Sequence, residues 1–157
     1  MSGRSLGIQR PSPRTDVGAR TLVLIGALLG APVCSGDVDA SLRAELARYN
    51  RYVAHQWGDS IASMFAADGE LEIPGRASLR GPPAIREFLA MFTNVRVDSS
   101  AMWADSVVRS DSGYVLWGGY FQRATVVGQP PVTAHGRIRA EWRRGAGRWE
   151  LRRLETF

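Results

Sequence analysis

Apolar residues recur at helical spacing through the first half of the chain. Between residues 37 and 56 they come every three or four positions and so share one face of a predicted helix: Leu42, Leu46, Tyr49 and Val53. Gly58 is expected to end this helix, and Asp59 to cap a second, short one. Gly81 and Pro82 open a third helix, since proline is tolerated in the first turn. Its buried stripe is predicted to be Ile85, Phe88, Leu89 and Phe92.

Apolar residues come at every second position in the strands that the sequence predicts. A short strand is expected at residues 70–73, after a turn at Asp68 and Gly69. Four longer strands are expected at about 94–108, 113–127, 132–143 and 148–156. The third of these has an apolar face and a polar face, the latter formed by Thr133, His135, Arg137, Arg139, Glu141 and Arg143. The second is apolar on both faces, which indicates cover by the helices on one side and by a second subunit on the other.

The predicted order is helix, helix, strand, helix and then an antiparallel meander of four strands. Helices segregated to one face of such a sheet make an α+β fold. The chain has 157 residues, which suits one domain. We therefore expect a single α+β domain over residues 37–157.

The basic charge of the chain is concentrated at its N-terminus. All 20 basic residues are arginines, and the formal net charge is +5. Residues 37–157 hold 16 arginines and 14 acidic residues, which leaves a net charge of +2. This part has no run of basic residues and no nucleic-acid-binding motif, so we do not expect a nucleic-acid partner.

Residues 1–36 resemble an export signal. Four arginines precede a 13-residue apolar stretch at 21–33, which is too short to span a bilayer but suits the core of a signal peptide. Cys34 follows, and it is the single cysteine of the chain, so no disulfide is expected within the domain. One interpretation is a lipoprotein with lipid on Cys34 as its membrane anchor; another is cleavage near Gly36 or Ala40. A third is an N-terminal helix retained in a cytosolic protein. We expect export to the periplasm or the extracellular space.

Three segments of the domain resemble the nuclear transport factor 2-like superfamily, which includes ketosteroid isomerases, scytalone dehydratases and SnoaL-like polyketide cyclases. They are MFAADGELEIPG at 64–75, GPPAIREF at 81–88 and GAGRWELRRLETF at 145–157. The resemblance implies a cone-shaped, curved antiparallel sheet with three N-terminal helices packed on its concave face and a pocket between them. It is specific for fold and weak for activity, because this fold carries both enzymes and non-enzymes.

Comparison with ketosteroid isomerases implies a partial catalytic set. Tyr49 falls at the position of the tyrosine that donates a hydrogen bond to the oxyanion, and Tyr52 lies one turn further along. The position of the aspartate base is Ile73, which cannot take a proton, and the second acid falls near Arg139. Two of the three catalytic positions are therefore lost, so the isomerase reaction is not expected.

The remaining candidates depend on which strand face looks into the pocket. His135 would be a general base near neutral pH if its face points inward, with Glu141 or Glu155 orienting it; facing outward, it is an ordinary solvated side chain. The predicted catalytic residues are thus His135 and Tyr49, and the predicted ligand contacts are Tyr52, Phe88, Trp117 and Arg139. His55 is expected to face solvent, and Glu70 and Glu72 to form a solvated strand edge.

We expect no metal and no cofactor. The two histidines are 80 residues apart, and the chain has no metal-ligand spacing and no glycine-rich phosphate loop. The sequence favours an exported protein that binds a small apolar or anionic molecule, with or without weak acid–base activity of the isomerase, dehydratase or cyclase type. The alternative is a non-catalytic dimerisation or accessory module of the cell envelope. A homodimer is expected in both cases.

Overall fold

The computed structural model describes residues 40–157. The predicted signal peptide, Cys34 and the first residues of the predicted helix at 37–56 lie outside this range. The elements in chain order are α1 (Ala40–Ala54), α2 (Gly58–Ser63), β1 (Phe65–Glu72), β2 (Leu79–Arg80), α3 (Gly81–Ala90), β3 (Val95–Ser110), β4 (Gly113–Val126), β5 (Val132–Arg144) and β6 (Trp149–Thr156). Among these residues no helix is long and apolar enough to cross a membrane.

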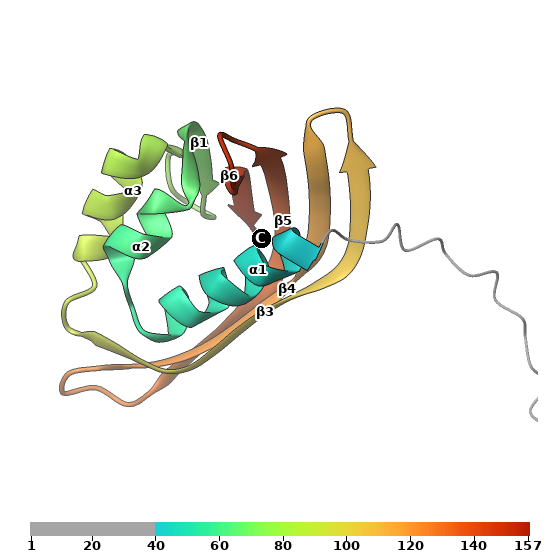
Figure 1. The fold of residues 1–157 in the computed structure, drawn as a ribbon. Coiled ribbons are helices and arrows are strands. Elements are labelled where there is room, and N and C mark those ends of the chain that lie inside the picture. Colours follow the sequence, from blue (N-terminus) through green and yellow to red (C-terminus); the bar gives the residue numbers. More distant parts are fainter. Residues whose placement is uncertain (1–39) are drawn as a thin grey trace, which may run out of the picture. The chain divides into compact units, whose positions relative to one another are not determined.

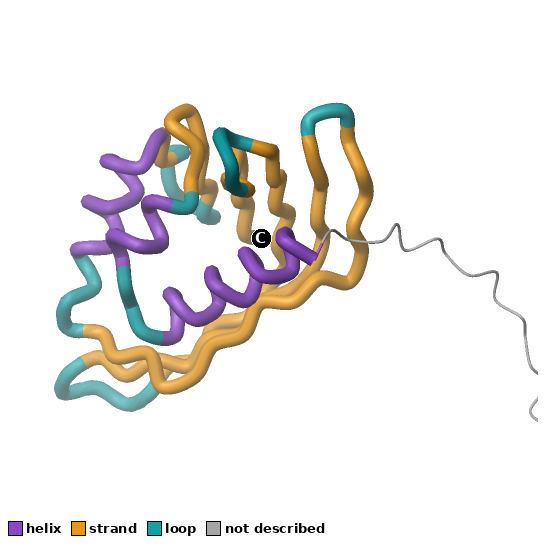
Figure 2. The backbone as a smooth tube through the Cα atoms, in the orientation of Figure 1, coloured by secondary structure: helices purple, strands orange, loops and turns teal. Residues whose placement is uncertain are grey.

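The strands form one six-stranded sheet in the order β2-β1-β6-β5-β4-β3. Figure 1 shows that this sheet is curved and that α1 lies across its concave face, with α2 and α3 beside β1. Figure 2 shows β3, β4 and β5 as the long strands of the curved layer. The predicted α+β class and helical cover of the concave face are confirmed. The sheet is mixed rather than wholly antiparallel, because β1 runs parallel to β6.

Alternation along the strands separates a buried face from an exposed one, as the pattern of β5 predicts. Ile138, Ala140 and Trp142 are 0%, 1% and 3% exposed, and they face the helices. The core continues through the other elements with Leu42, Ile61, Phe65, Ile85, Leu116, Leu151 and Leu154. The residues between them, such as Arg139 and Glu141, lie on the convex face. This choice of face decides which side chains can reach a pocket on the concave side.

Several predicted boundaries were wrong. Asp68 and Gly69 do not form a turn before the first strand; they lie within β1, where the register with β6 shifts between Phe65 and Glu70. A Cβ at position 69 would come within 2.8 Å of the Leu151 carbonyl oxygen, so the close approach of two backbones requires glycine here. The first helix is ended by Gln56, whose φ of 56° is in the left-handed region, whereas Gly58 begins α2.

Candidate functional site

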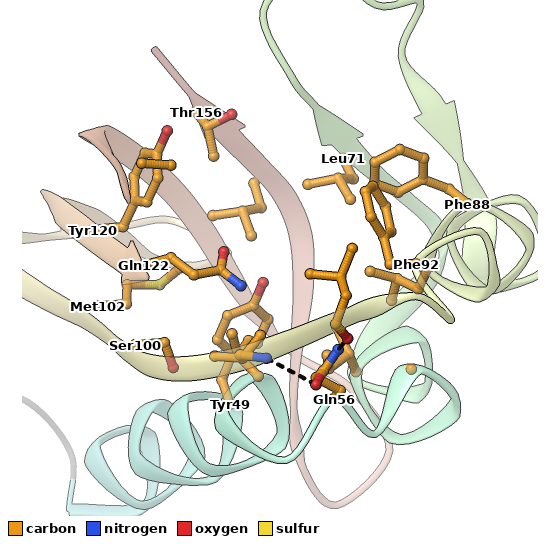
Figure 3. Close-up of a pocket in the computed structure, with 18 of the residues that line it drawn as sticks. Tyr49, Gln56, Leu71, Phe88, Phe92, Ser100, Met102, Tyr120, Gln122 and Thr156 are labelled. Carbon is orange, nitrogen blue, oxygen red and sulfur yellow. Dashed lines mark hydrogen bonds between the residues drawn. The ribbon is translucent and has the colours of Figure 1, made fainter. Parts of the chain in front are cut away.

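A cavity of about 760 Å³ lies between the helices and the concave face of the sheet. All three helices and every strand except β2 contribute to its lining. Figure 3 shows side chains from α1, β3, β4 and β6 converging on this space from several sides. Its walls are largely apolar, with Val53, Leu71, Ile73, Phe88, Phe92 and Leu154 among the lining residues. The volume falls in the range of ordinary small-molecule sites.

Tyr49 carries the hydroxyl that α1 directs into this cavity (Figure 3). The residue is only 7% exposed, because its ring is part of the core. Burial raises the pKa of the Tyr49 hydroxyl above its ordinary value of 10.0. The hydroxyl therefore stays protonated at physiological pH and is available as a hydrogen-bond donor.

Gln122 brings a second polar group to the cavity from β4. The register of the sheet places it opposite Ser100 of β3, which also lines the cavity. Figure 3 shows the Gln122 side chain extending into the cavity toward the ring of Tyr49. Tyr49 and Gln122 therefore present a hydroxyl and a carboxamide to the same space.

Two side-chain amides fix the position of α1 against β3, which is an edge strand of the sheet. The Asn50 amide nitrogen donates to the Met102 carbonyl (2.9 Å), and the Met102 N–H donates to the Asn50 side-chain oxygen (2.8 Å). Gln56, just after the end of α1, makes the same kind of contact with β3. Its amide nitrogen donates to the Val95 carbonyl (2.6 Å), and its side-chain oxygen accepts from the Val97 N–H (3.0 Å). Each amide occupies backbone groups that a neighbouring strand would otherwise take. These contacts hold one wall of the cavity in place.

The lining is nearly free of charge. Among the described residues that line the cavity, the charged side chains are Asp59 and Arg86, and they pair with each other at 2.6 Å. Both are well exposed, so the pair lies at the rim. No histidine is among the lining residues, and within the described part of the chain no cluster of three metal-ligating side chains was found. The cavity offers hydrogen bonds from neutral groups and apolar contacts.

The predicted site residues divide between the two faces of the sheet. Tyr49 and Phe88 line the cavity, whereas Tyr52, Trp117, His135 and Arg139 are not among its lining residues. His135 pairs with Phe121 and is exposed on the convex face, because the neighbouring positions of β5 take the buried face. The condition on which its role as a base depended is therefore not met. Tyr52 packs beside Trp57, with ring centroids 5.7 Å apart.

Arg139 and Trp117 belong to a different surface. The Arg139 guanidinium lies 5.5 Å from the centre of the Trp117 ring and also pairs with Glu141 and Glu155. Trp103, Trp117 and Phe121 are 46%, 40% and 37% exposed and share the convex face of β3 and β4 by register, where they form an aromatic row; Phe121 also borders the cavity. Gly119 leaves room for the Trp103 ring, since a Cβ at position 119 would come within 2.4 Å of the indole.

The cavity also contains residues that the sequence-based prediction missed. Gln122 shares its strand face with Leu116 and Tyr120, so a polar residue on an otherwise apolar face was the available signal. Asn50 and Gln56 gave no such signal, because a polar residue on a helix usually faces solvent. The β3 partner of Asn50 lies 52 positions further along the chain, and the two β3 partners of Gln56 lie 39 and 41 positions further along.

Comparison with known proteins agrees with this architecture. Residues 38–155 match the model of the SnoaL-like domain family. The structure is similar to a ketosteroid isomerase-like protein from Erwinia carotovora atroseptica, at 21% identity and a TM-score of 0.66 over 74% of this chain and 92% of that chain. It is also similar to ActVI-ORFA from Streptomyces coelicolor, at 14% identity and a TM-score of 0.64 over 75% and 94% of the two chains.

A third similar structure is a putative scytalone dehydratase from Novosphingobium aromaticivorans, at 13% identity and a TM-score of 0.62 over 74% of this chain and 80% of that chain. No curated protein matches this chain. At these identities the structural similarity establishes the fold, a nuclear transport factor 2-like α+β domain, and leaves the chemistry to be argued from the cavity.

Proposed function

This chain belongs to the SnoaL-like domain family. We propose, from the geometry and lining of the cavity between α1 and the sheet, that it binds one small, uncharged and mainly apolar molecule there. The observation that carries the proposal is the cavity itself: about 760 Å³, with apolar walls and a buried hydroxyl directed into it. Protein cores are ordinarily close-packed, so an unfilled space of this size with polar side chains in its lining indicates a binding site for a ligand.

The charge of the lining favours an uncharged ligand over the anionic one that the sequence left open. An anion placed among Val53, Leu71 and Phe88 would lose its hydration, and that loss costs several kcal/mol unless a cation pairs with it. The Arg86 guanidinium is already paired with Asp59 at the rim. A neutral ring system avoids this cost.

The cavity favours binding over acid–base turnover. Its described lining holds no histidine, and its one carboxylate, Asp59, is exposed and paired with Arg86. Ile73 occupies the place where the resemblance puts the aspartate base, and Arg139 lies on the convex face. The activities in the names of the similar structures are therefore not extended to this chain.

Binding of a flat aromatic ketone tests the proposal. We expect 9-fluorenone to bind the full-length protein saturably in equilibrium dialysis. Ala134 lines the cavity and Thr133, its neighbour on β5, faces the other way, so Ala134→Phe and Thr133→Phe form a matched pair. Ala134→Phe should weaken binding at least tenfold, and Thr133→Phe should leave it unchanged. Equal effects of the two substitutions, or no saturable binding, would contradict the proposal.

We propose a second copy of this chain as the partner at the convex face. The exposed aromatic row of Trp103, Trp117 and Phe121 supports it, and so does internal pairing of nearby charges, such as Arg137 with Asp105 at 2.6 Å. This surface also favours the alternative function, a dimerisation or accessory module. Light scattering should show a dimer that Trp117→Ser dissociates and Trp57→Ser, an exposed tryptophan of the helical side, does not. A wild-type monomer at micromolar concentration would contradict the dimer.

Export is a further proposal, based on the charge and length of the apolar stretch at 21–33. The intact mass of the protein recovered from an exporting host distinguishes the alternatives. Removal of about the first 36 residues supports cleavage by a signal peptidase, and a mass that begins at Cys34 with added lipid supports the lipoprotein. The mass of the whole 157-residue chain would contradict export.

A further inference from the structure

Large apolar side chains are exposed at three connections between elements that are far apart in the sequence. Five such residues are between 42% and 80% exposed, and we call them the apolar collar: Trp57, Met91, Phe92, Val127 and Val132. The segments that hold them, 55–58, 91–95 and 126–133, contain no arginine, lysine or carboxylate. Apolar residues scattered singly over a surface are ordinary, so the question is whether these five lie together.

Hydrogen bonds join the three connections to one another. The Gln56 amide nitrogen donates to the Val95 carbonyl at 2.6 Å, and the Val95 N–H donates to the Phe92 carbonyl at 3.2 Å. The Val127 N–H donates to the Asn94 carbonyl at 3.0 Å. Figures 1 and 2 show the α1–α2, α3–β3 and β4–β5 connections together at the left end of the domain. The collar is therefore one surface, and such surfaces are typical of contact with a partner or a membrane.

The cavity opens at the apolar collar. Gln56, Phe92 and Thr93 line the cavity and are also exposed, so it reaches the surface between these connections. Among the described residues, none at 103–119 or 135–153 lines the cavity, and these ranges include the two turns at the opposite end of the sheet. A ligand that enters or leaves between these connections passes the collar.

The opposite end of the sheet has charged turns. Arg109 and Asp111 are at the β3–β4 turn, and Arg144 and Arg148 flank the β5–β6 turn. Apolar side chains in a solvated turn lose the stabilisation that burial would give them, so a charged turn is the ordinary arrangement. The apolar, uncharged surface is thus specific to the end at which the cavity opens.

We propose that the apolar collar docks on the surface of a phospholipid bilayer, with the mouth of the cavity facing the lipid. Tryptophan is favoured at the membrane interface, and the other collar side chains gain from leaving water there. A bilayer, unlike a protein partner, also dissolves an apolar ligand, so docking lets the ligand pass between lipid and cavity without crossing water. This exchange rests on the proposed function, whereas the docking itself does not.

The charges beside the collar favour a surface that carries phosphate groups. Within five positions of the three collar segments, the sequence has five arginines and three acidic residues: Arg51, Arg86, Arg96, Arg123 and Arg137, and Asp59, Glu87 and Asp98. The excess of two positive charges around an uncharged centre complements an anionic bilayer surface. It suits vesicles that contain phosphatidylglycerol.

Quenching of tryptophan fluorescence tests docking at the collar itself. The protein as purified from an exporting host is mixed with vesicles of phosphatidylglycerol and phosphatidylcholine brominated on its acyl chains, and bromine quenches the indoles that reach those chains. Trp57→Phe keeps an aromatic ring in the collar and removes its indole. This variant should lose most of the quenching, because the other exposed tryptophans, Trp103 and Trp117, lie on the convex face.

Two valines of equal exposure supply a matched pair of variants. Val132 in the collar is 57% exposed and Val108, near the β3–β4 turn, is 58% exposed, and neither lines the cavity. Val132→Asp should reduce the quenching at a fixed vesicle concentration by about fivefold, since it places a charge against lipid, and Val108→Asp should leave it unchanged. Both should bind 9-fluorenone as the wild-type protein does in dialysis without vesicles.

Three results would overturn the docking: no quenching of the wild-type protein, unchanged quenching in Trp57→Phe, or equal quenching in Val132→Asp and Val108→Asp. A changed oligomeric state of Val132→Asp in light scattering without vesicles would show that a second copy covers the collar, and it would overturn the docking too. A wild-type protein that docks through Trp57 but binds no 9-fluorenone would contradict the proposed function and leave the docking standing.

Discussion

Replacing Asn50 with alanine removes both hydrogen bonds that hold the middle of α1 on the edge of the sheet. The two bonds, at 2.9 and 2.8 Å, join one side-chain amide to the N–H and C=O of Met102. Each such bond contributes about 0.5–1.5 kcal/mol net, and a partly buried backbone group left unpaired adds to the loss. The free energy of unfolding should therefore fall by about 2–3 kcal/mol.

Urea unfolding followed by circular dichroism measures this loss. For a domain of this size a loss of 2–3 kcal/mol lowers the midpoint by roughly 1–2 M urea. Asn50→Asp keeps the acceptor for the Met102 N–H but loses the donor to its carbonyl, so its midpoint should fall between alanine and wild type. Asn94→Ala, in the exposed turn before β3, is the control and should change stability by less than about 0.5 kcal/mol. An Asn50→Ala midpoint equal to that of the control would refute the claim that the Asn50 amide holds α1 on the edge strand β3.

Two further predictions concern Gln56 and Asp98. Gln56→Gly and Gln56→Ala both lose two hydrogen bonds to β3. Glycine adopts the φ of 56° without strain, so in urea unfolding the glycine variant should be more stable than the alanine variant by about 1 kcal/mol. Equal free energies of unfolding would contradict backbone strain at position 56. The pKa of Asp98 is lowered below its ordinary value of 3.8. The main cause is a hydrogen bond from the Thr125 hydroxyl, and the contact with Arg96 has a smaller effect in the same direction. Its stabilising effect is present above the unfolded pKa and is lost as pH falls through the folded value. NMR titration should show that pKa rise in Thr125→Val, and an unchanged value would contradict the assignment.

The helices and the long strands could be predicted from the sequence because their signals are local. The alternation of Ile138, Ala140 and Trp142 with charged residues indicated which face of β5 is buried, and the stripe through Leu42 and Tyr49 indicated the inner face of α1. Each signal reports a period of two or 3.6 residues, which a single element satisfies by itself. The fold class followed from the order of these elements.

The parts that depend on contacts between distant segments could not be predicted in the same way. The parallel pairing of β1 with β6 joins Glu70 to Arg153, and no local pattern records it. Asp68 and Gly69 have a turn-forming composition, yet the approach of Leu151 places them inside a strand. For the site, the apolar pattern indicated which face of β5 is buried. That the cavity lies on this face, and that His135 is therefore outside it, depends on how all the strands and helices are arranged.

Native mass spectrometry of the protein as purified from an exporting host, with and without added 9-fluorenone, tests the ligand site most directly. We expect one small molecule per chain, present on purification or taken up from the added ketone, that is released on denaturation and is absent from Ala134→Phe. Thr133→Phe should retain it. A wild-type spectrum that shows the bare chain in both conditions, as in Ala134→Phe, would contradict the claim that the cavity of α1 and the sheet is a ligand site.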